Sequence, residues 1–387
     1  MIQTIARRAA LTFVLAACGF AWAAPKAPAD AAAQGGDVVL YVAPAGDDAR
    51  SAQSPAEAVR TLGRIQDLLK ARGFKEAERR IVVRFLPGTY RGLEVTWDFV
   101  APGRSITFEP DDYQSGRFTV VMDGQNSDAR RFFLLRLTES PPDDAPIATA
   151  ITIRGLHITN YCEGISFGDW KSKAVVSGNL VEGNRLTRIG SMFQSPTRQA
   201  DGRMMPTGDC VAAIRLQRAA NNVIRGNVFE EIENLPAKQT ASAKYGPLLL
   251  HAIYLANRSS GNLIEGNRFD RFSGSPVRIR AESNDTRVVN NTFADPVFPA
   301  RLKAGYQIKA ISQWYCNEAV PACRDKADDG NTECPSLGTQ IIGNRVVGPL
   351  DLYADESQSK NATCAAGQLR GTGSIEPRLE GNAVSGR

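Results

Sequence analysis

Cationic and hydroxyl-bearing side chains recur at one position in a series of short apolar segments. These segments are expected to be strands, and they span residues 133–137, 164–168, 213–217, 252–256, 276–280 and 307–311. Strand side chains alternate between two faces, so the apolar residues of each segment, from Leu135 and Leu137 to Ile308 and Ala310, should point inward. The residues between them, which should point outward, are Arg136, Ser166, Arg215, Tyr254, Arg278 and Lys309, with Arg280 two residues beyond Arg278.

If these strands stack in register about 4.8 Å apart, the outward residues form one polar and mostly cationic column. Guanidinium groups match carboxylates in geometry and charge, so such a column is suited to a polymer of uronic acids. A solvated, ion-paired sheet face would have the same composition. The aromatic residue Trp314 lies near a strand end, as do Trp170 and Tyr315. Their rings could stack on sugars or pack within the protein.

Tyr254 and His251 are the first candidates for acid–base chemistry. β-Elimination of a uronide needs a cation beside the carboxylate, a base for the C5 proton and an acid for the leaving oxygen. Tyr254 lies between Arg215 and Arg278 in the column, and positive charge on both sides of a phenol favours its ionised form. Tyr254 or Lys309 could therefore be the base, and His251 is a further candidate. Alternatively, Tyr254 is a surface tyrosine and His251 only forms a hydrogen bond at the start of its strand.

Three carboxylates lie near the ends of neighbouring strands: Glu163, Asp169 and Asp209. A pair of carboxylates could hydrolyse a glycoside or hold Ca²⁺. The alternative is that they cap turns, as Asp often does. We therefore expect either no cofactor or Ca²⁺, and the sequence does not identify a metal ligand set.

A repeated motif indicates how these residues are positioned. The segment SGNLVEGNRL at 177–186 returns as SGNLIEGNRF at 260–269, and related copies have their Gly or Asn at 155, 183, 226, 266, 290, 343 and 381. Units of this size with short strands and Gly-Asn turns are typical of the coils of a parallel β-helix. Asn tolerates the left-handed backbone of a tight corner, and stacked Asn side chains can hydrogen-bond as a ladder.

The longer spacings between copies place insertions at 189–209, at 233–250 and from 294 to about 338. We expect all of them to approach the outward column from the same corner and to line a groove beside it.

A helix is predicted within residues 54–73, before the first coil. Ser54 is its expected N-cap, Pro55 its first residue and Glu57 the partner in a capping box. Ala58, Leu62, Ile65 and Leu69 form its apolar stripe. Because the end of a β-helix exposes core residues, this helix should cover that end.

The N-terminus is typical of a signal peptide, with Arg7 and Arg8 before an apolar run and a small-x-small site at 21–23. We assign 1–24 to the signal peptide, 25–36 to a flexible linker and 37–387 to the β-helix, with an N-terminal cap at about 37–79 and coils at about 80–387. In an alternative interpretation, LAAC at 15–18 is a lipoprotein box and Cys18 carries a lipid anchor. With a signal peptide the protein is expected to be periplasmic or secreted, and with a lipoprotein box it is expected to be anchored in the envelope.

Six further cysteines fit an oxidising compartment. Cys162 and Cys210 precede equivalent strands by similar distances, so we predict that they form a disulfide. Cys316, Cys323, Cys334 and Cys364 should pair within the C-terminal insertions.

Together, YVAPAGDD at 41–48, the capping helix, RIVVRFLPGTYRG at 80–92 and the Gly-Asn corners resemble the pectin-lyase-like right-handed parallel β-helix proteins, over about residues 37–387. The resemblance implies an all-β, single-stranded solenoid with an N-terminal capping helix. It does not imply one activity, because that superfamily includes lyases, epimerases, glycosidases, esterases and surface proteins. The pectate-lyase calcium and arginine signatures, the polygalacturonase aspartates and the pectinesterase and epimerase motifs are all missing.

Composition supports an ordinary folded protein, with 43 % hydrophobic residues and a net charge of +5. The leading hypothesis is an exported protein that binds an acidic polysaccharide and cleaves it by β-elimination. The alternatives are a glycoside hydrolase and a non-catalytic envelope or polysaccharide-binding protein. We expect no nucleic-acid partner and no membrane-spanning segment after the signal peptide, and the oligomeric state stays open.

Overall fold

The computed structural model describes residues 36–75, 80–126, 131–141, 145–169, 171–193, 197–198, 204–205, 210–234, 246–294, 296, 308–314, 334–355 and 373–386. The predicted signal peptide, Cys18 and nearly all of the predicted linker lie outside these ranges.

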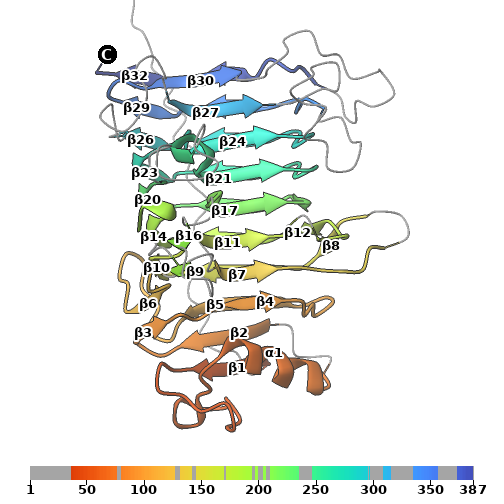
Figure 1. The fold of residues 1–387 in the computed structure, drawn as a ribbon. Coiled ribbons are helices and arrows are strands. Elements are labelled where there is room, and N and C mark those ends of the chain that lie inside the picture. The colour runs from red at the N-terminus through yellow and green to blue at the C-terminus, as the bar shows by residue number, and fades with distance from the viewer. Residues whose placement is uncertain are drawn as a thin grey trace, which may run out of the picture. The chain divides into compact units, whose positions relative to one another are not determined.

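Three parallel sheets form most of the described structure (Figure 1). The first sheet contains, in spatial order, β1 (Asp37–Val42), β2 (Arg80–Phe85), β5 (Ser105–Pro110), β9 (Ile151–Arg154), β13 (Leu180–Glu182), β19 (Val223–Arg225), β22 (Leu263–Glu265), β25 (Arg287–Val289), β28 (Gln340–Ile342) and β31 (Arg378–Glu380). The second contains β3 (Gly88–Arg91), β6 (Val120–Asp123), β10 (His157–Thr159), β14 (Arg185–Ile189), β20 (Val228–Ile232), β23 (Arg268–Phe272), β26 (Thr292–Ala294), β29 (Arg345–Val347) and β32 (Ala383–Ser385). The third contains β4 (Val95–Trp97), β7 (Arg131–Leu135), β11 (Glu163–Phe167), β17 (Ala212–Gln217), β21 (His251–Ala256), β24 (Val277–Arg280), β27 (Lys309–Trp314) and β30 (Asp351–Asp355).

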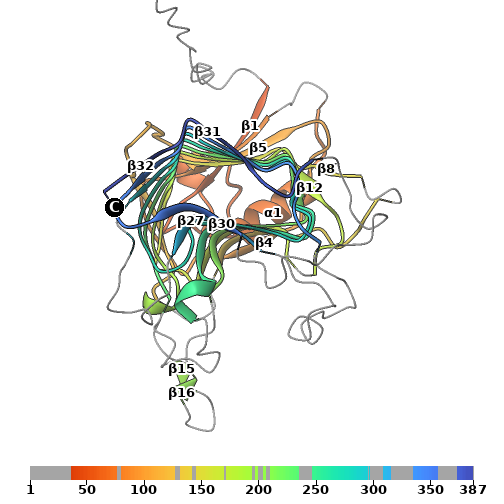
Figure 2. The same cartoon turned by 90° about the horizontal axis from the view of Figure 1, so that it is seen from above.

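Each complete coil contributes one strand to each sheet before the chain rises to the next coil. Seen along the stack, the strands of successive coils lie over one another (Figure 2). Two small additions are a sheet of β8 (Ile147–Ala148), β12 (Val176–Ser177) and β18 (Ala219–Ala220), and an antiparallel pair of β15 (Thr197–Arg198) and β16 (Met204–Met205). The predicted right-handed parallel β-helix is confirmed.

The repeated motif forms the corner between the first and second sheets. Gly183, Gly226 and Gly266 have φ of 59°, 62° and 62°, and Asn290 takes the same conformation with φ 55°. The left-handed conformation is open to glycine and tolerated by asparagine, which explains why these two residue types alternate at the corner.

The asparagine after each corner forms a buried ladder. The side-chain amides of Asn184, Asn227, Asn267, Asn291 and Asn344 each donate to the next asparagine along the stack, ending at Asn382, with N–O distances of 3.0–3.1 Å. A shorter ladder joins Asn179, Asn222 and Asn262 at another corner. These bonds satisfy backbone and side-chain groups that the core would otherwise leave unpaired. The predicted ladder is confirmed.

Apolar side chains of all three sheets fill the space between them. Phe229, Phe269 and Phe293 stack along the second sheet, with ring centroids 4.9 and 4.8 Å apart. Each of these phenylalanines is fully buried. Stacking of this kind follows from the register, which repeats one residue position every coil.

The predicted capping helix is shorter than expected and is interrupted. Ser54 caps only a 3₁₀ turn, η1 (Pro55–Glu57), and α1 (Leu62–Ala71) starts after a separate N-cap, Thr61. The Asp48 carboxylate accepts hydrogen bonds from the backbone of Arg60 and Thr61, and Val59 pairs with Val42 of β1. These contacts hold the chain extended between the two helical segments.

The apolar stripe of the helix is nevertheless buried as predicted. Leu62, Ile65 and Leu69 are fully covered, and α1 packs against β4. The first coil is therefore closed by the helix.

The predicted disulfide between Cys162 and Cys210 is present, with Cα atoms 5.1 Å apart. Cys334 is also disulfide-bonded. Cys316, Cys323 and Cys364 lie outside the described residues.

The predicted insertions do not all share a corner. Segments 190–211, 233–250 and 295–308 connect the second sheet to the third, as expected, and include η2 (Ser191–Phe193) and η4 (Gly246–Leu249). Residues 315–339 instead connect β27 of the third sheet to β28 of the first, so this segment belongs to a different corner.

Candidate functional site

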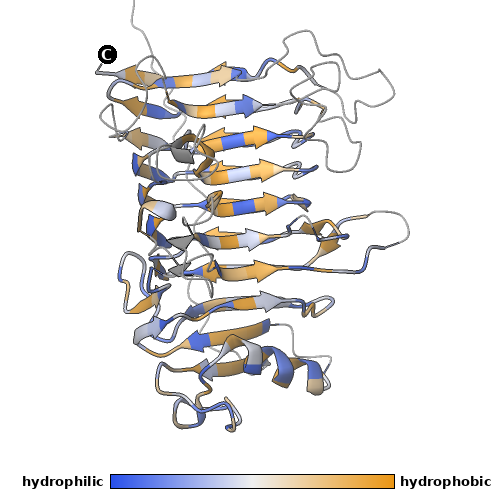
Figure 3. Ribbon diagram, in the orientation of Figure 1, coloured by the Kyte–Doolittle hydropathy of each residue, from blue (hydrophilic) through white to orange (hydrophobic). Residues whose placement is uncertain are grey.

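The outward face of the third sheet carries the predicted column, but the residues at its two ends differ from those predicted. The strand register aligns Thr96, Leu134, Ser166, Arg215, Tyr254, Arg278, Ser312 and Ala354. Hydrophilic bands cross β17 and β24 on this face, with a paler band on β21 between them (Figure 3). The four central positions were predicted correctly, and the cations of the column are Arg215 and Arg278.

Arg136 was placed in the column wrongly. Leu134 pairs with Ser166 instead, and Arg136 follows the end of β7. Its guanidinium forms an ion pair with Asp169. The four residues from Phe132 to Leu135 are all buried, so their alternation does not select one register.

Lys309 was also placed in the column wrongly. Arg278 pairs with Ser312, three residues further along the chain, and Lys309 pairs with Asp351 and forms an ion pair with it. Ala310 and Ile311 are both fully buried. Because two successive residues are apolar, the sequence does not show which of them faces the core and which faces outward. Lys309 is thereby removed from the neighbourhood predicted for a base.

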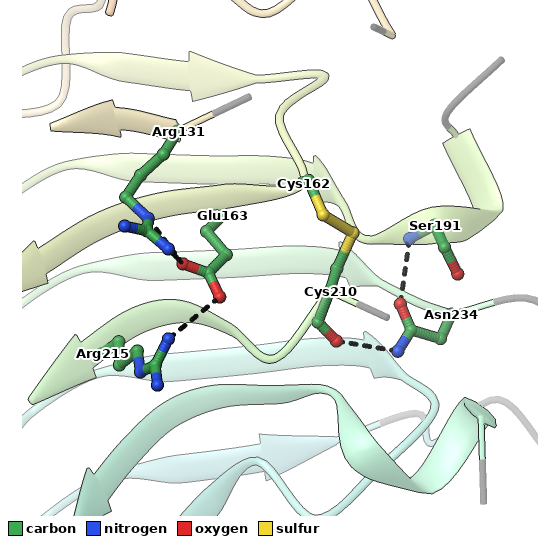
Figure 4. Close-up of a disulfide and its surroundings, with 7 residues drawn as sticks. All are labelled: Arg131, Cys162, Glu163, Ser191, Cys210, Arg215 and Asn234. Atoms are coloured by element: carbon green, nitrogen blue, oxygen red, sulfur yellow. Dashed lines mark hydrogen bonds and ion pairs between the residues drawn. A yellow bond between two sulfur atoms is a disulfide. The ribbon is translucent and has the colours of Figure 1, made fainter. Parts of the chain in front are cut away.

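Glu163 joins two arginines on this face (Figure 4). Its Oε2 accepts a hydrogen bond of 2.6 Å from Arg131 Nε, and its Oε1 lies 3.6 Å from Arg215 Nη1. Arg215 Nη2 also donates to Gln217 Oε1 at 2.7 Å. Glu163 is almost fully buried, and a buried charge needs partners. The two guanidinium groups balance it.

Two polar atoms beside this ion-pair chain have no hydrogen-bond partner among the residues that the structure describes. They are Ser166 Oγ and Arg215 Nε, and both are buried. The two residues pair directly across β11 and β17. Buried polar groups are rarely left unpaired, so this position is suited to an additional oxygen from water or a ligand.

Tyr254 lies between Arg215 and Arg278, in register with both. Its ring stacks on that of His251, with centroids 5.7 Å apart and planes inclined by 17°. His251 Nδ1 donates to the Ser275 carbonyl oxygen at 2.7 Å.

Burial lowers the pKa of His251 to about 3, and the nearby Arg278 charge adds to this effect. His251 is therefore neutral at physiological pH, with its proton on Nδ1. Its ring supports the Tyr254 ring by stacking.

Arg278, Arg280 and Trp314 form the next part of the face. Arg278 Nη1 donates to Ser312 Oγ at 2.9 Å, and the Arg280 guanidinium lies 4.1 Å from the Trp314 ring centroid. Cation–π stacking on the Trp314 ring orients the Arg280 guanidinium. The sequence analysis identified Arg280 and Trp314 separately but not as a pair, because their contact depends on the register of β24 and β27.

Asp169 is unsuited to acid catalysis. Burial acts to raise the pKa of its carboxyl, but hydrogen bonding and charge from Arg136 outweigh burial and hold the pKa below its usual value. Asp209, Trp170 and Tyr315 lie outside the described residues.

Three further residues of this face, Arg131, Gln217 and Ser312, were not among the predicted site residues. Arg131 and Gln217 are the first and last residues of their strands, where alternation is a weak guide. Ser312 was missed because of the register error in β27.

Within the described ranges, no three or more His, Cys, Asp or Glu side chains are grouped so that they could hold a metal ion. The described helices include none that is long and apolar enough to span a membrane.

Two solved structures of low sequence identity align with most of the chain. An alginate lyase from Paenibacillus sp. str. FPU-7 is 13 % identical, with a TM-score of 0.46, over 90 % of this chain and 98 % of the lyase. Pectate lyase Pel9A is 12 % identical, with a TM-score of 0.45, over 90 % of this chain and 77 % of that protein.

No curated protein matches the sequence. Residues 145–348, more than half of the 387-residue chain, match a family described as periplasmic copper-binding protein (NosD). The matched segment runs from before β8 to the end of β29 and includes the central strands of the third sheet. The chain therefore belongs to the NosD family.

Proposed function

We propose that this protein is exported to the periplasm, binds an acidic polysaccharide on the outward face of the third sheet and cleaves it by β-elimination. The observation that carries the proposal is the position of Tyr254 between Arg215 and Arg278 on three adjacent strands. Neighbouring strands lie about 4.8 Å apart, so a sugar ring over Tyr254 would have a guanidinium on either side.

In the proposed reaction, Arg215 and Arg278 neutralise the uronate carboxylate and stabilise the charge that develops when the C5 proton leaves. Tyr254, as the phenolate, takes that proton. The electron pair forms the C4–C5 double bond and the C4–O bond breaks. The phenol then returns its proton to the leaving oxygen, so that Tyr254 acts as base and acid in turn.

Neighbouring side chains orient both arginines. Glu163 and Gln217 hold Arg215, and Ser312 holds Arg278. Arg280, stacked on Trp314, would bind the carboxylate of a neighbouring sugar.

A glycoside hydrolase is less well supported. A hydrolase needs one carboxylic acid with a raised pKa. Asp169 has a lowered pKa, and Glu163 is held between Arg131 and Arg215. Neither carboxylate is therefore arranged to donate a proton to a glycosidic oxygen. Binding without catalysis uses the same face and is separated from the lyase proposal by the experiment below.

The family description names copper, and the described histidines and cysteines do not form a copper site on this face. Copper is held by imidazole and sulfur ligands. The chain has two histidines, and His251 lies beside Arg278 and Arg280, whose charges repel a cation. His157 is bonded to Thr187 on the second sheet. Cys162 and Cys210 are joined in a disulfide. No step of the proposed reaction uses copper. Ca²⁺ is not assigned to a site, and the assay tests whether it is required.

The test is a screen of the full chain against acidic and neutral polysaccharides, with and without Ca²⁺, following ultraviolet absorbance of the new double bond and reducing ends. A lyase produces both signals, a hydrolase only reducing ends and a binding protein neither. Tyr254→Phe keeps the ring and its stacking on His251 but removes the ionisable hydroxyl. We expect turnover to collapse in this variant while affinity stays near that of the wild type.

Arg278→Ala should weaken polysaccharide binding by about 2 kcal/mol, or about thirtyfold. Arg345→Ala is the matched control, because Arg345 is exposed on the second sheet. Full activity of Tyr254→Phe would refute the mechanism. Undiminished binding by Arg278→Ala would refute the site.

A further inference from the structure

The two ends of the coil stack differ in how their core residues are covered. At the N-terminal end, Val38, Leu40 and Val42 of β1 are buried. At the other end, β30, β31 and β32 are the terminal described strands of the three sheets (Figure 2). Leu379 is 54 % exposed and Val384 is 39 % exposed there, although their partners Ile341 and Val346 are fully buried. Among the described residues, this coil therefore continues the core stacks and leaves Leu379 and Val384 exposed.

The hydrogen-bonding groups of β31 and β32 are also directed away from the stack. Arg378 N donates to Thr339 O, and Glu380 O accepts from Gly343 N, so these two residues bond toward β28. In a parallel strand, alternate residues bond to opposite sides, so the N–H and C=O of Leu379 point off the open edge. Ala383 and Ser385 bond toward β29, which leaves Val384 in the same position on β32.

An open edge of this kind is a template for another strand. The sequence of β31 indicates which strand fits it. Leu379 is flanked by Arg378 and Glu380, which form an exposed ion pair with each other. In an antiparallel pairing centred on Leu379, Leu379 would bond reciprocally with Leu379 of a second copy. Arg378 would then face Glu380 of that copy, and Glu380 would face its Arg378.

We propose that this end of the β-helix is a self-association surface at which two copies of the chain pair across a two-fold axis through Leu379. The pairing is isologous, because the same residues of both copies form the contact and Arg378 of each copy faces Glu380 of the other. An isologous contact of this kind gives a closed dimer. It satisfies the two backbone groups of Leu379, covers Leu379 and forms two opposite-charge pairs. The proposal is independent of the polysaccharide site, which lies on the face of the third sheet.

The test uses charge reversal on the full chain, with molar mass measured by light scattering and sedimentation over a range of concentrations. Arg378→Glu and Glu380→Arg each place like charges opposite one another, and each should weaken the dimer on the order of tenfold or more. The double variant Arg378→Glu/Glu380→Arg restores opposite charges across the two-fold axis and should dimerise as the wild type does.

Three further measurements complete the test. An equimolar mixture of the two single variants should form a mixed dimer, and Leu379→Lys should be monomeric because two ammonium groups would meet at the axis. A melting curve for each variant checks that the coils are folded. A wild-type chain that stays monomeric throughout, or a dimer that Arg378→Glu leaves unchanged, would overturn the proposal.

Discussion

Replacing Asn267 with leucine tests what the interior asparagine ladder contributes to stability. Asn267 is 1 % exposed. Its Oδ1 accepts from Asn227 N and Nδ2, both at 3.0 Å, and its Nδ2 donates to Ile224 O and Asn291 Oδ1 at 2.9 and 3.0 Å. Leucine suits the geometry, because Leu156 occupies the equivalent position in an earlier coil and is fully buried.

The expected cost follows from which partners are left unsatisfied. Asn227 Nδ2 keeps its bonds to Val181 O and Arg225 O, and Asn291 Oδ1 keeps the bond from the residue 267 backbone. The Asn227 N–H loses the acceptor that Asn267 provides and stays buried, which costs about 1–3 kcal/mol. The lost bond to Ile224 O adds about 1 kcal/mol, so the total is about 3 kcal/mol.

The matched control is Asn382→Leu at the end of the same ladder. Asn382 accepts from Asn344 N at 2.9 Å, but this bond is only partly buried and water can replace it. We expect a loss of about 1 kcal/mol or less.

Thermal and urea unfolding, followed by circular dichroism, measure both variants. At about 2 °C per kcal/mol for a chain of this length, Asn267→Leu should melt on the order of 5 °C below the wild type. Equal melting temperatures for Asn267→Leu and Asn382→Leu would contradict the argument that burial of the ladder bonds determines their contribution.

Three further predictions concern the cap, the disulfide and the pH dependence of stability. Leu62→Asp combined with Leu69→Asp should remove about 4 kcal/mol of burial and prevent accumulation of soluble protein, whereas an unchanged melting curve would show that α1 does not cover the core. Replacing Cys162 and Cys210 together with alanine should cost about 4 kcal/mol for a 48-residue separation, and urea unfolding without reducing agent measures this loss. An unfolding midpoint equal to that of the wild type would contradict this prediction. In the folded protein the pKa of His251 is lowered to about 3, whereas in the unfolded chain it is about 6.5. As the pH falls, the imidazole is therefore protonated first in the unfolded chain. The contribution of His251 to the free energy of unfolding is complete above about pH 6.5 and is lost as the pH falls toward 3. Unfolding at pH 7 and pH 5 should show a smaller loss in His251→Gln, and an identical loss would disprove this assignment.

Much of the fold follows from local sequence patterns. The Gly-Asn corners require a left-handed backbone, and their recurrence specifies stacked coils, the ladder and the inward faces of β11, β17, β21 and β24. The pairing of Cys162 with Cys210 followed from the same register. These features depend on residue type and short-range geometry, which the sequence displays directly.

The rest depended on which residues meet in three dimensions. The buried run at 132–135 fits more than one register, and the buried pair at 310–311 fits either face of a strand. Only pairing with β11 and β24 therefore decided the places of Arg136 and Lys309. The break before α1 depended on Asp48, which is remote in sequence from Thr61. The ion pairs of Glu163 with Arg131 and Arg215, and the stacking of Arg280 on Trp314, join residues on different coils. Alternation gives each side chain a face, but only packing between coils determines its partner.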